Sequence, residues 1–89
     1  TVKPGQRLSL QSHAKRDELW SIVGGVGVVV IDGLEIPVSY GKTVDINAGK
    51  KHRMINSGSE ILTFVEVQTG TYFGEDDIIR YEDDYGREK

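Results

Sequence analysis

Four residues in two parts of the chain have the chemistry to bind a metal ion. Gln11 and His13 are separated by one residue, so on a β-strand their side chains project from the same face. Glu18 follows a short polar link, and His52, the second of two histidines, follows a glycine-containing turn. Imidazole nitrogens and carboxylate or amide oxygens are ligands of divalent metals. These four residues are a candidate metal site if their side chains meet; the alternative is that each histidine is a surface residue or one with an ordinary hydrogen-bond partner.

These side chains can meet only if short strands lie side by side. β-Branched and apolar runs alternate with Gly, Asp and Asn at short intervals, which is typical of an all-β barrel or sandwich. Asp32-Gly33 predicts a two-residue hairpin turn, and Pro37 predicts an edge strand. The first two strands are expected to pair as a hairpin. The predicted strands cover residues 7–11, 18–23, 27–31, 34–40, 43–46, 52–56 and 61–69.

The stretch after Gly70 is aromatic and acidic. Only residues 76–82 are expected to form a helical turn, with Asp76 as its N-cap. The acidic pairs at 76–77 and 83–84 lack the spacing of a calcium loop, so a solvated tail is expected. Elsewhere, Trp20 is expected in the core, while Lys51 and Arg53 have the opposite parity to His52 and are expected to face outward.

Length and composition restrict the class of protein. The 89 residues are enough for one domain, covering residues 1–89. A net charge of −3 gives no basic face for nucleic acid, and no run approaches the roughly 20 apolar residues of a membrane span. The absence of cysteine excludes disulfides and thiol catalysis. We expect a cytoplasmic protein with neither nucleic-acid nor membrane partners.

The spacing of the predicted ligands resembles the two motifs of the cupin superfamily. The first motif runs from Gly5 to Gly25 around the ligands at 11, 13 and 18, and the second runs from Gly41 to Asn56 around His52. The resemblance implies an antiparallel jelly-roll β-barrel in a single domain. Gln-x-His, where cupins usually carry His-x-His, is similar to the phosphomannose isomerases.

Further stretches resemble the C-terminal cupin domain of type II mannose-6-phosphate isomerases, which is often fused to a mannose-1-phosphate guanylyltransferase. These stretches are L-S-L-Q-x-H at 8–13, R-x-E-x-W at 16–20, A-G-x-K-H-R at 48–53 and the long block at 66–87. The resemblance implies one divalent metal ion, zinc first and cobalt, nickel, manganese or iron as alternatives. It also implies a metal-dependent aldose–ketose isomerase that interconverts mannose 6-phosphate and fructose 6-phosphate through an enediol.

Four further residues are assigned roles in that reaction. Glu66 is expected to be the general base, and Arg16 is expected to balance the charge of the enediolate or the phosphate. Arg80 and Arg87 are expected to bind the phosphate, because a guanidinium matches it bidentately. The alternatives are a solvated polar pair for Glu66 with Gln68, an exposed turn residue for Arg16, and surface salt bridges for the two later arginines.

The chain departs from the family at Ala14, Lys15 and Leu19, where histidine is usual. These departures favour one alternative, a non-catalytic sugar-binding cupin. A second alternative is another metal-dependent cupin enzyme, such as a dioxygenase. The strand at 34–40 is a predicted edge, so a homodimer is expected to form there, with a sugar phosphate as the small-molecule partner.

Overall fold

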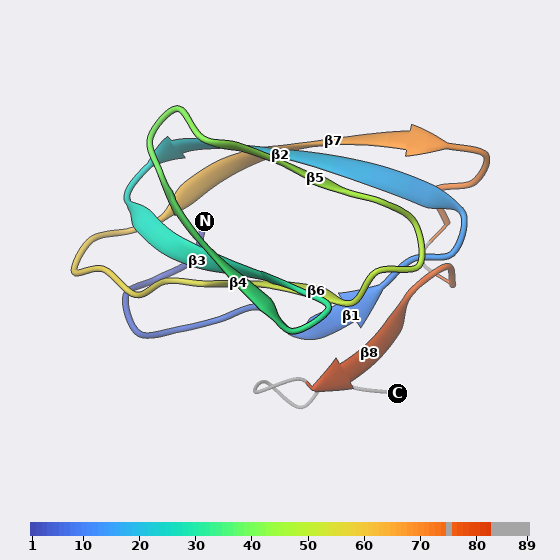
Figure 1. Ribbon diagram of the computed structural model, residues 1–89, viewed down its shortest axis with the longest axis horizontal. Coiled ribbons are helices and arrows are strands. Elements are labelled where there is room, and N and C mark those ends of the chain that lie inside the picture. The colour runs from blue at the N-terminus through green and yellow to red at the C-terminus, as the bar shows by residue number, and fades with distance from the viewer. Residues whose placement is uncertain (75, 83–89) are drawn as a thin grey trace.

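The computed structural model describes residues 1–74 and 76–82, and they form two antiparallel sheets facing each other (Figure 1). The five-stranded sheet has the order β4-β3-β6-β1-β8, and the three-stranded sheet has the order β5-β2-β7. The described residues contain no helix, so the all-β prediction is confirmed, and none of them forms a helix that could cross a membrane. The strands are β1 (Leu10–Ser12), β2 (Arg16–Gly24), β3 (Val26–Ile31), β4 (Leu34–Ser39), β5 (Thr43–Ile46), β6 (His52–Ile55), β7 (Thr63–Gly70) and β8 (Ile79–Glu82).

Alternation along β2 decides which side chains face the interior. Arg16, Glu18, Trp20 and Ile22 are buried, while the intervening residues are exposed or only partly buried. This period of two is that of a strand with one face on the core. The ring of Trp20 lies 4.8 Å from that of Phe64 between ring centroids, so Trp20 is in the core as predicted.

The β3–β4 hairpin follows its predicted turn. Asp32 and Gly33 both have positive φ, 48° and 85°, as the tight hairpin turn between paired strands requires. β4 is an edge strand, so Pro37 costs the sheet no interior hydrogen bond.

Four local predictions are wrong, and one of them is the solvated tail at 76–77, because Asp77 is buried. β1 and β2 are not a hairpin, because β1 pairs with β6 and β8 while β2 pairs with β5 and β7. Residues 76–82 form a turn and then β8, because the free edge of β1 offers backbone partners that a single helical turn lacks. Arg53 is 5% exposed, because the segment before β1 covers it and the Leu8 carbonyl accepts a hydrogen bond from its Nε. Lys51 is exposed as predicted.

We expect Gly25→Ala to destabilise the fold by about 3 kcal/mol, because it combines strain with a steric clash. Gly25 has φ +83°, and an added Cβ would lie 2.6 Å from the Ile61 carbonyl oxygen. Gly41→Ala is the matched control: φ is +89° but no atom lies within 4 Å, so about 1 kcal/mol is expected. Urea unfolding measures both; equal losses would contradict the steric argument.

Candidate metal centre

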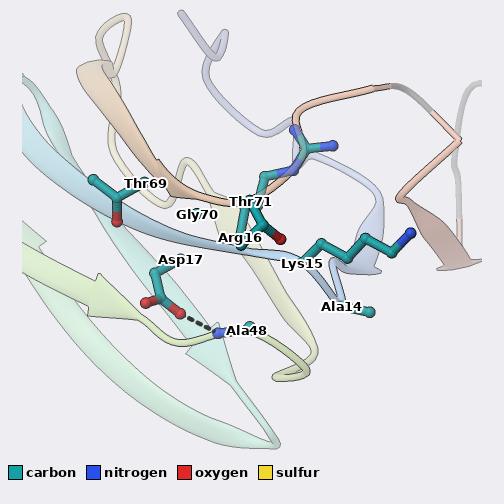
Figure 2. A pocket seen from close by; sticks show the side chains of 8 residues that line it. All are labelled: Ala14, Lys15, Arg16, Asp17, Ala48, Thr69, Gly70 and Thr71. Atoms are coloured by element: carbon teal, nitrogen blue, oxygen red, sulfur yellow. Dashed lines mark hydrogen bonds between the residues drawn. The ribbon is translucent and has the colours of Figure 1, made fainter.

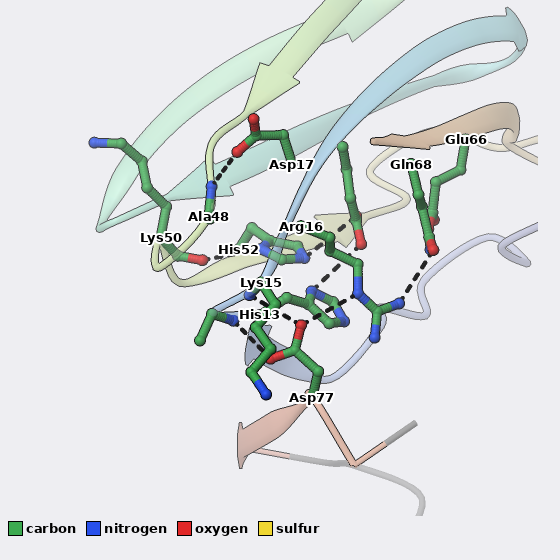
Figure 3. A network of polar contacts seen from close by, with 12 residues as sticks. His13, Lys15, Arg16, Asp17, Ala48, Lys50, His52, Glu66, Gln68 and Asp77 are labelled. Atoms are coloured by element: carbon green, nitrogen blue, oxygen red, sulfur yellow. Dashed lines mark hydrogen bonds and ion pairs between the residues drawn. The ribbon is translucent and has the colours of Figure 1, made fainter. Parts of the chain in front are cut away.

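Three ionisable side chains, each from a different part of the chain, converge between the two sheets. His13 directly follows β1, Glu18 lies in β2, and His52 opens β6. One ligand atom from each lies within 4.8 Å of the others. His13 Nδ1 is 3.3 Å from Glu18 Oε2, and His52 Nε2 is 3.6 Å from Glu18 Oε1. The two imidazole rings are stacked with centroids 5.5 Å apart (Figure 3).

Register places the fourth predicted ligand on the same side. Gln11 is directly opposite His52 in the β1–β6 ladder, and directly opposite residues project from the same face of a sheet. The side chain of Gln11 is therefore on the face that carries His52, and it is partly buried. Its role as a ligand remains a prediction.

The histidine nitrogens that face Glu18 are suited to a cation. The Lys50 carbonyl lies 3.0 Å from His52 Nδ1, and because a carbonyl can only accept, Nδ1 carries the proton and Nε2 a free lone pair. Within the described residues, His52 Nε2 and His13 Nδ1 are buried without a hydrogen-bond partner. The hydrogen bond between His52 Nδ1 and the Lys50 carbonyl is typical of metal-binding histidines, which donate from the ring nitrogen that does not face the metal. The donor set and its unpartnered nitrogens therefore fit a divalent metal ion.

Burial shapes the charge of the cluster. It lowers the pKa of His13 to about 4, with help from the Arg16 charge, and it also lowers the pKa of His52. Burial, followed by the Glu66 charge, raises the pKa of Glu18 to about 7. The histidines are therefore neutral at pH 7, as metal ligands must be. Without an ion, the carboxylate ionises only near neutrality, so these contacts are not ordinary salt bridges.

Trp20 also supports the carboxylate, a role that the sequence did not predict. Its indole Nε1 donates to Glu18 Oε1 at 2.9 Å, and its ring is nearly perpendicular to that of His52, with the two ring centroids 5.4 Å apart. Glu18 and Trp20 are two positions apart on β2, so both face inward. This spacing was the available signal, since a buried indole N–H usually finds an acceptor.

A polar chain links Arg16 to the cluster (Figure 3). Arg16 Nη1 donates to Gln68 Oε1 at 3.1 Å, and Gln68 Nε2 donates to Glu66 Oε2. Glu66 is opposite Trp20 in the β2–β7 ladder and hence on the inner face, where it acts on the pKa of Glu18. Arg16 is 7% exposed and not an exposed turn residue. Glu66 itself is exposed, so solvent reaches the inner face along β7.

Arg80 lies on the same side of the five-stranded sheet. It is opposite Gln11 in the β1–β8 ladder, so Arg80, Gln11 and His52 form one row across three strands. Its charge helps to lower the pKa of His13, after burial and the charges of Arg16 and His52. Its Nε is buried without a hydrogen-bond partner among the described residues. Arg87, the other predicted phosphate ligand, lies outside the described residues.

The departures from the family's histidines do not fall inside the cluster. Leu19 is the Cα partner of Val67, and both project from the outer face of the three-stranded sheet, opposite to Glu18. Ala14 and Lys15 are exposed, and the Lys15 ammonium lies 5.1 Å from the centre of the Tyr72 ring. The absence of histidine at position 19 therefore removes no group that faces the candidate ligands.

A surface pocket of about 230 Å³ lies beside Arg16 rather than at the cluster (Figure 2). Ala48 N donates to Asp17 Oδ1 at 2.7 Å at this pocket, which ties the β5–β6 turn to β2. The Arg16 guanidinium points away from this bond (Figure 2). The pocket is lined by Ala14, Lys15, Arg16, Asp17, Ala48, Thr69, Gly70 and Thr71.

Two facing antiparallel sheets with a buried His/Glu/His cluster between them define a cupin. A double-stranded β-helix protein from Klebsiella pneumoniae has the same fold: TM-score 0.80, 23% identity, and 91% of this chain and 69% of that one covered. The family model described as "Mannose-6-phosphate isomerase C-terminal" matches residues 1–83, and the chain belongs to this family.

Curated relatives extend the comparison. The chain is 44% identical to a mannose-1-phosphate guanylyltransferase of Escherichia coli and 46% identical to the alginate biosynthesis protein AlgA of Pseudomonas aeruginosa, each over 87 residues. Each match covers 98% of this chain but 18% of the relative. The chain thus spans less than a fifth of the length of these proteins.

We expect Zn²⁺ at one hundred times its Kd to raise the free energy of unfolding by about 2.7 kcal/mol, because it binds the folded state alone. His52→Ala should remove this increase, while Lys51→Ala, an exposed neighbour, should keep it. Urea unfolding followed by the fluorescence of the single tryptophan measures the effect. An undiminished increase in His52→Ala would exclude His52 as a ligand.

We expect metal affinity to fall about tenfold per pH unit below pH 7, because protons compete for Glu18, whose pKa is about 7. His13, with a pKa of about 4, stays neutral across this range. Glu18→Gln should bind more weakly but with little change between pH 8 and 6. Titration calorimetry at several pH values measures this; the same pH slope in Glu18→Gln would show that another group competes.

Proposed function

We propose that this domain interconverts mannose 6-phosphate and fructose 6-phosphate. The observation that carries the proposal is a buried His/Glu/His cluster joined through Gln68 and Glu66 to a buried arginine, Arg16. Membership of the mannose-6-phosphate isomerase C-terminal family supports it. The relatives' names, mannose-1-phosphate guanylyltransferase and alginate biosynthesis protein, support a role in sugar-phosphate metabolism.

A metal ion belongs to this proposal. Gln11, His13, Glu18 and His52 would hold one divalent ion, with zinc as the first choice. When bound, such an ion polarises the carbonyl and hydroxyl oxygens of an open-chain sugar, which makes the hydrogen on the carbon between them more acidic. The neutral histidines and the carboxyl group of pKa about 7 suit this role, because the cluster has at most one proton to give up when the ion binds near neutral pH.

Glu66 is the general base in this proposal. It takes the proton from C2 of the aldose and returns it to C1, while the hydroxyl proton passes from O2 to O1, so that the enediol collapses to the ketose. Glu66 suits the role because it faces inward beside Glu18 yet is reached by solvent. Gln68 Nε2 donates to its carboxylate and so orients it.

The two arginines bind the negative charge. Arg16 donates one N–H from Nη1 to Gln68 Oε1 and one N–H from Nη2 to the Gly74 carbonyl. Each of these two nitrogens keeps a second N–H that can bind a substrate oxygen. Arg80 is in the row with Gln11 and His52, and its buried Nε is a free donor among the described residues. Arg16 and Arg80 therefore bind the enediolate or the phosphate, and Arg87 is proposed from the sequence alone.

Two alternative functions, a non-catalytic sugar-binding cupin and a dioxygenase, would give different results in an activity assay. A sugar-binding cupin without turnover would bind mannose 6-phosphate unchanged, and a dioxygenase would consume oxygen with iron bound. Leu19 faces away from the cluster, so the missing histidine at that position is no argument for the first alternative.

A homodimer through the edge strand β4 is also proposed, and its test is the molecular mass of the protein in solution.

We expect metal-loaded protein to convert mannose 6-phosphate to fructose 6-phosphate, and Glu66→Gln to lower kcat by about 10²–10⁴-fold, because the base is lost. Glu60→Gln is the matched control, an exposed glutamate whose backbone carbonyl accepts a hydrogen bond from Asn56 Nδ2, and it should keep full activity. Coupled spectrophotometric assays measure both. Bound metal and a stable fold without turnover would exclude this reaction.

A further inference from the structure

The acidic residue Asp77 is not part of a solvated tail. Its side chain is 5% exposed, although it lies in the short segment between β7 and β8. Its Oδ1 accepts from Ala14 N at 2.9 Å and its Oδ2 from Lys15 N at 3.0 Å. These two amides belong to the link between β1 and β2, more than sixty positions earlier in the chain. Asp77 therefore fastens the C-terminal segment to the link that crosses between the two sheets (Figure 3).

The same carboxylate faces the guanidinium of Arg16. Asp77 Oδ2 lies 3.5 Å from Arg16 Nε, and the Arg16 side chain is 7% exposed. Arg16 Nη2 also donates to the Gly74 carbonyl at 2.7 Å. A buried guanidinium that loses its carboxylate partner is left with an uncompensated charge and tends to move toward solvent. Removal of the Asp77 charge would therefore release Arg16 from its place.

The charge state of Asp77 fits this arrangement. Burial opposes its ionisation, but the hydrogen bonds from the amides of Ala14 and Lys15 and the contact with Arg16 outweigh burial and hold its pKa below the ordinary value. The neighbouring Asp76 differs from Asp77 in its exposure and in its partner. Asp76 is exposed, and its carboxylate accepts a hydrogen bond from the Tyr72 hydroxyl.

We propose that Asp77 is the positioning residue for Arg16: by holding the link at Ala14 and Lys15 and facing Nε, it fixes the guanidinium where the substrate's anionic oxygens bind. The inference rests on the proposed function, because it assigns Arg16 to those oxygens. Asp77 touches no substrate and acts through Arg16 alone. Gln68, which accepts from the other side of the guanidinium, completes the support and leads on to Glu66.

The first experiment follows the Arg16 side chain directly. In ¹⁵N NMR spectra the Nε–H signal of a fixed arginine exchanges slowly with water, and the signal of Arg16 is identified by its loss in Arg16→Lys. We expect this signal in the metal-loaded wild type, at least tenfold faster exchange in Asp77→Asn, and no change in the matched control Asp76→Asn. Unchanged exchange in Asp77→Asn would overturn the proposal.

If Asp77→Asn does not fold, the wild type and Asp77→Glu decide the point. An Arg16 Nε–H that exchanges as fast as that of free arginine is not held in place, and that result would overturn the proposal. Slow exchange that is kept in Asp77→Glu, which retains the charge on a longer side chain, would support an ion pair as the restraint.

The second experiment asks whether Asp77 acts through Arg16. We expect Asp77→Asn to raise the KM for mannose 6-phosphate about tenfold, and to raise it less than twofold further when Arg16→Met is already present. The same factor in both backgrounds would overturn the proposal, since Asp77 would then act independently. If the wild type shows no turnover, the isomerase function fails, while the NMR measurement still decides whether Asp77 positions Arg16.

Discussion

The structure depends on the burial of one carboxylate between two histidines. Glu18 is 5% exposed, and burial in a protein interior is costly for a charged group unless partners compensate for it. The Trp20 indole supplies a hydrogen bond, and the facing nitrogens of His13 and His52, which have no hydrogen-bond partner among the described residues, suit a shared cation. Because these groups come from both sheets, the cluster also fixes how the sheets meet. Metal binding and folding are therefore expected to be coupled.

Polar contacts extend from this cluster to Asp77, in the segment before β8. Glu66 lies beside Glu18, Gln68 connects it with Arg16, and Arg16 faces Asp77. The contacts join β2, β7 and the segment before β8, which are elements far apart in the sequence. Low local dielectric strengthens such a network when its members are satisfied and penalises it when one is removed. The groups proposed for catalysis thus share their support with the groups proposed for metal binding.

Side-chain direction separates changes that affect the site from changes that do not. Glu18 and Leu19 are adjacent in sequence but project from opposite faces of β2. A substitution at position 19 therefore changes the outer face of the three-stranded sheet, while a substitution at position 18 changes the buried His/Glu/His cluster. The same rule puts Gln11, His52 and Arg80 in one row, since directly opposite residues in paired strands share a face.

Local pattern in the sequence was enough for the all-β class, the Asp32-Gly33 turn and the inward Trp20, because strand periodicity and turn chemistry act over a few residues. The meeting of His13, Glu18 and His52 was predicted from the resemblance to the cupin motifs, since the hairpin expected to join the first two does not form. Only the tertiary structure decided that β1 and β2 belong to different sheets, that residues 79–82 form a strand, and that Arg53 and Asp77 are buried. The physical reason is that edge pairing and the burial of a charge depend on partners distant in the sequence, here β1 for β8, Leu8 for Arg53, and Ala14 to Arg16 for Asp77.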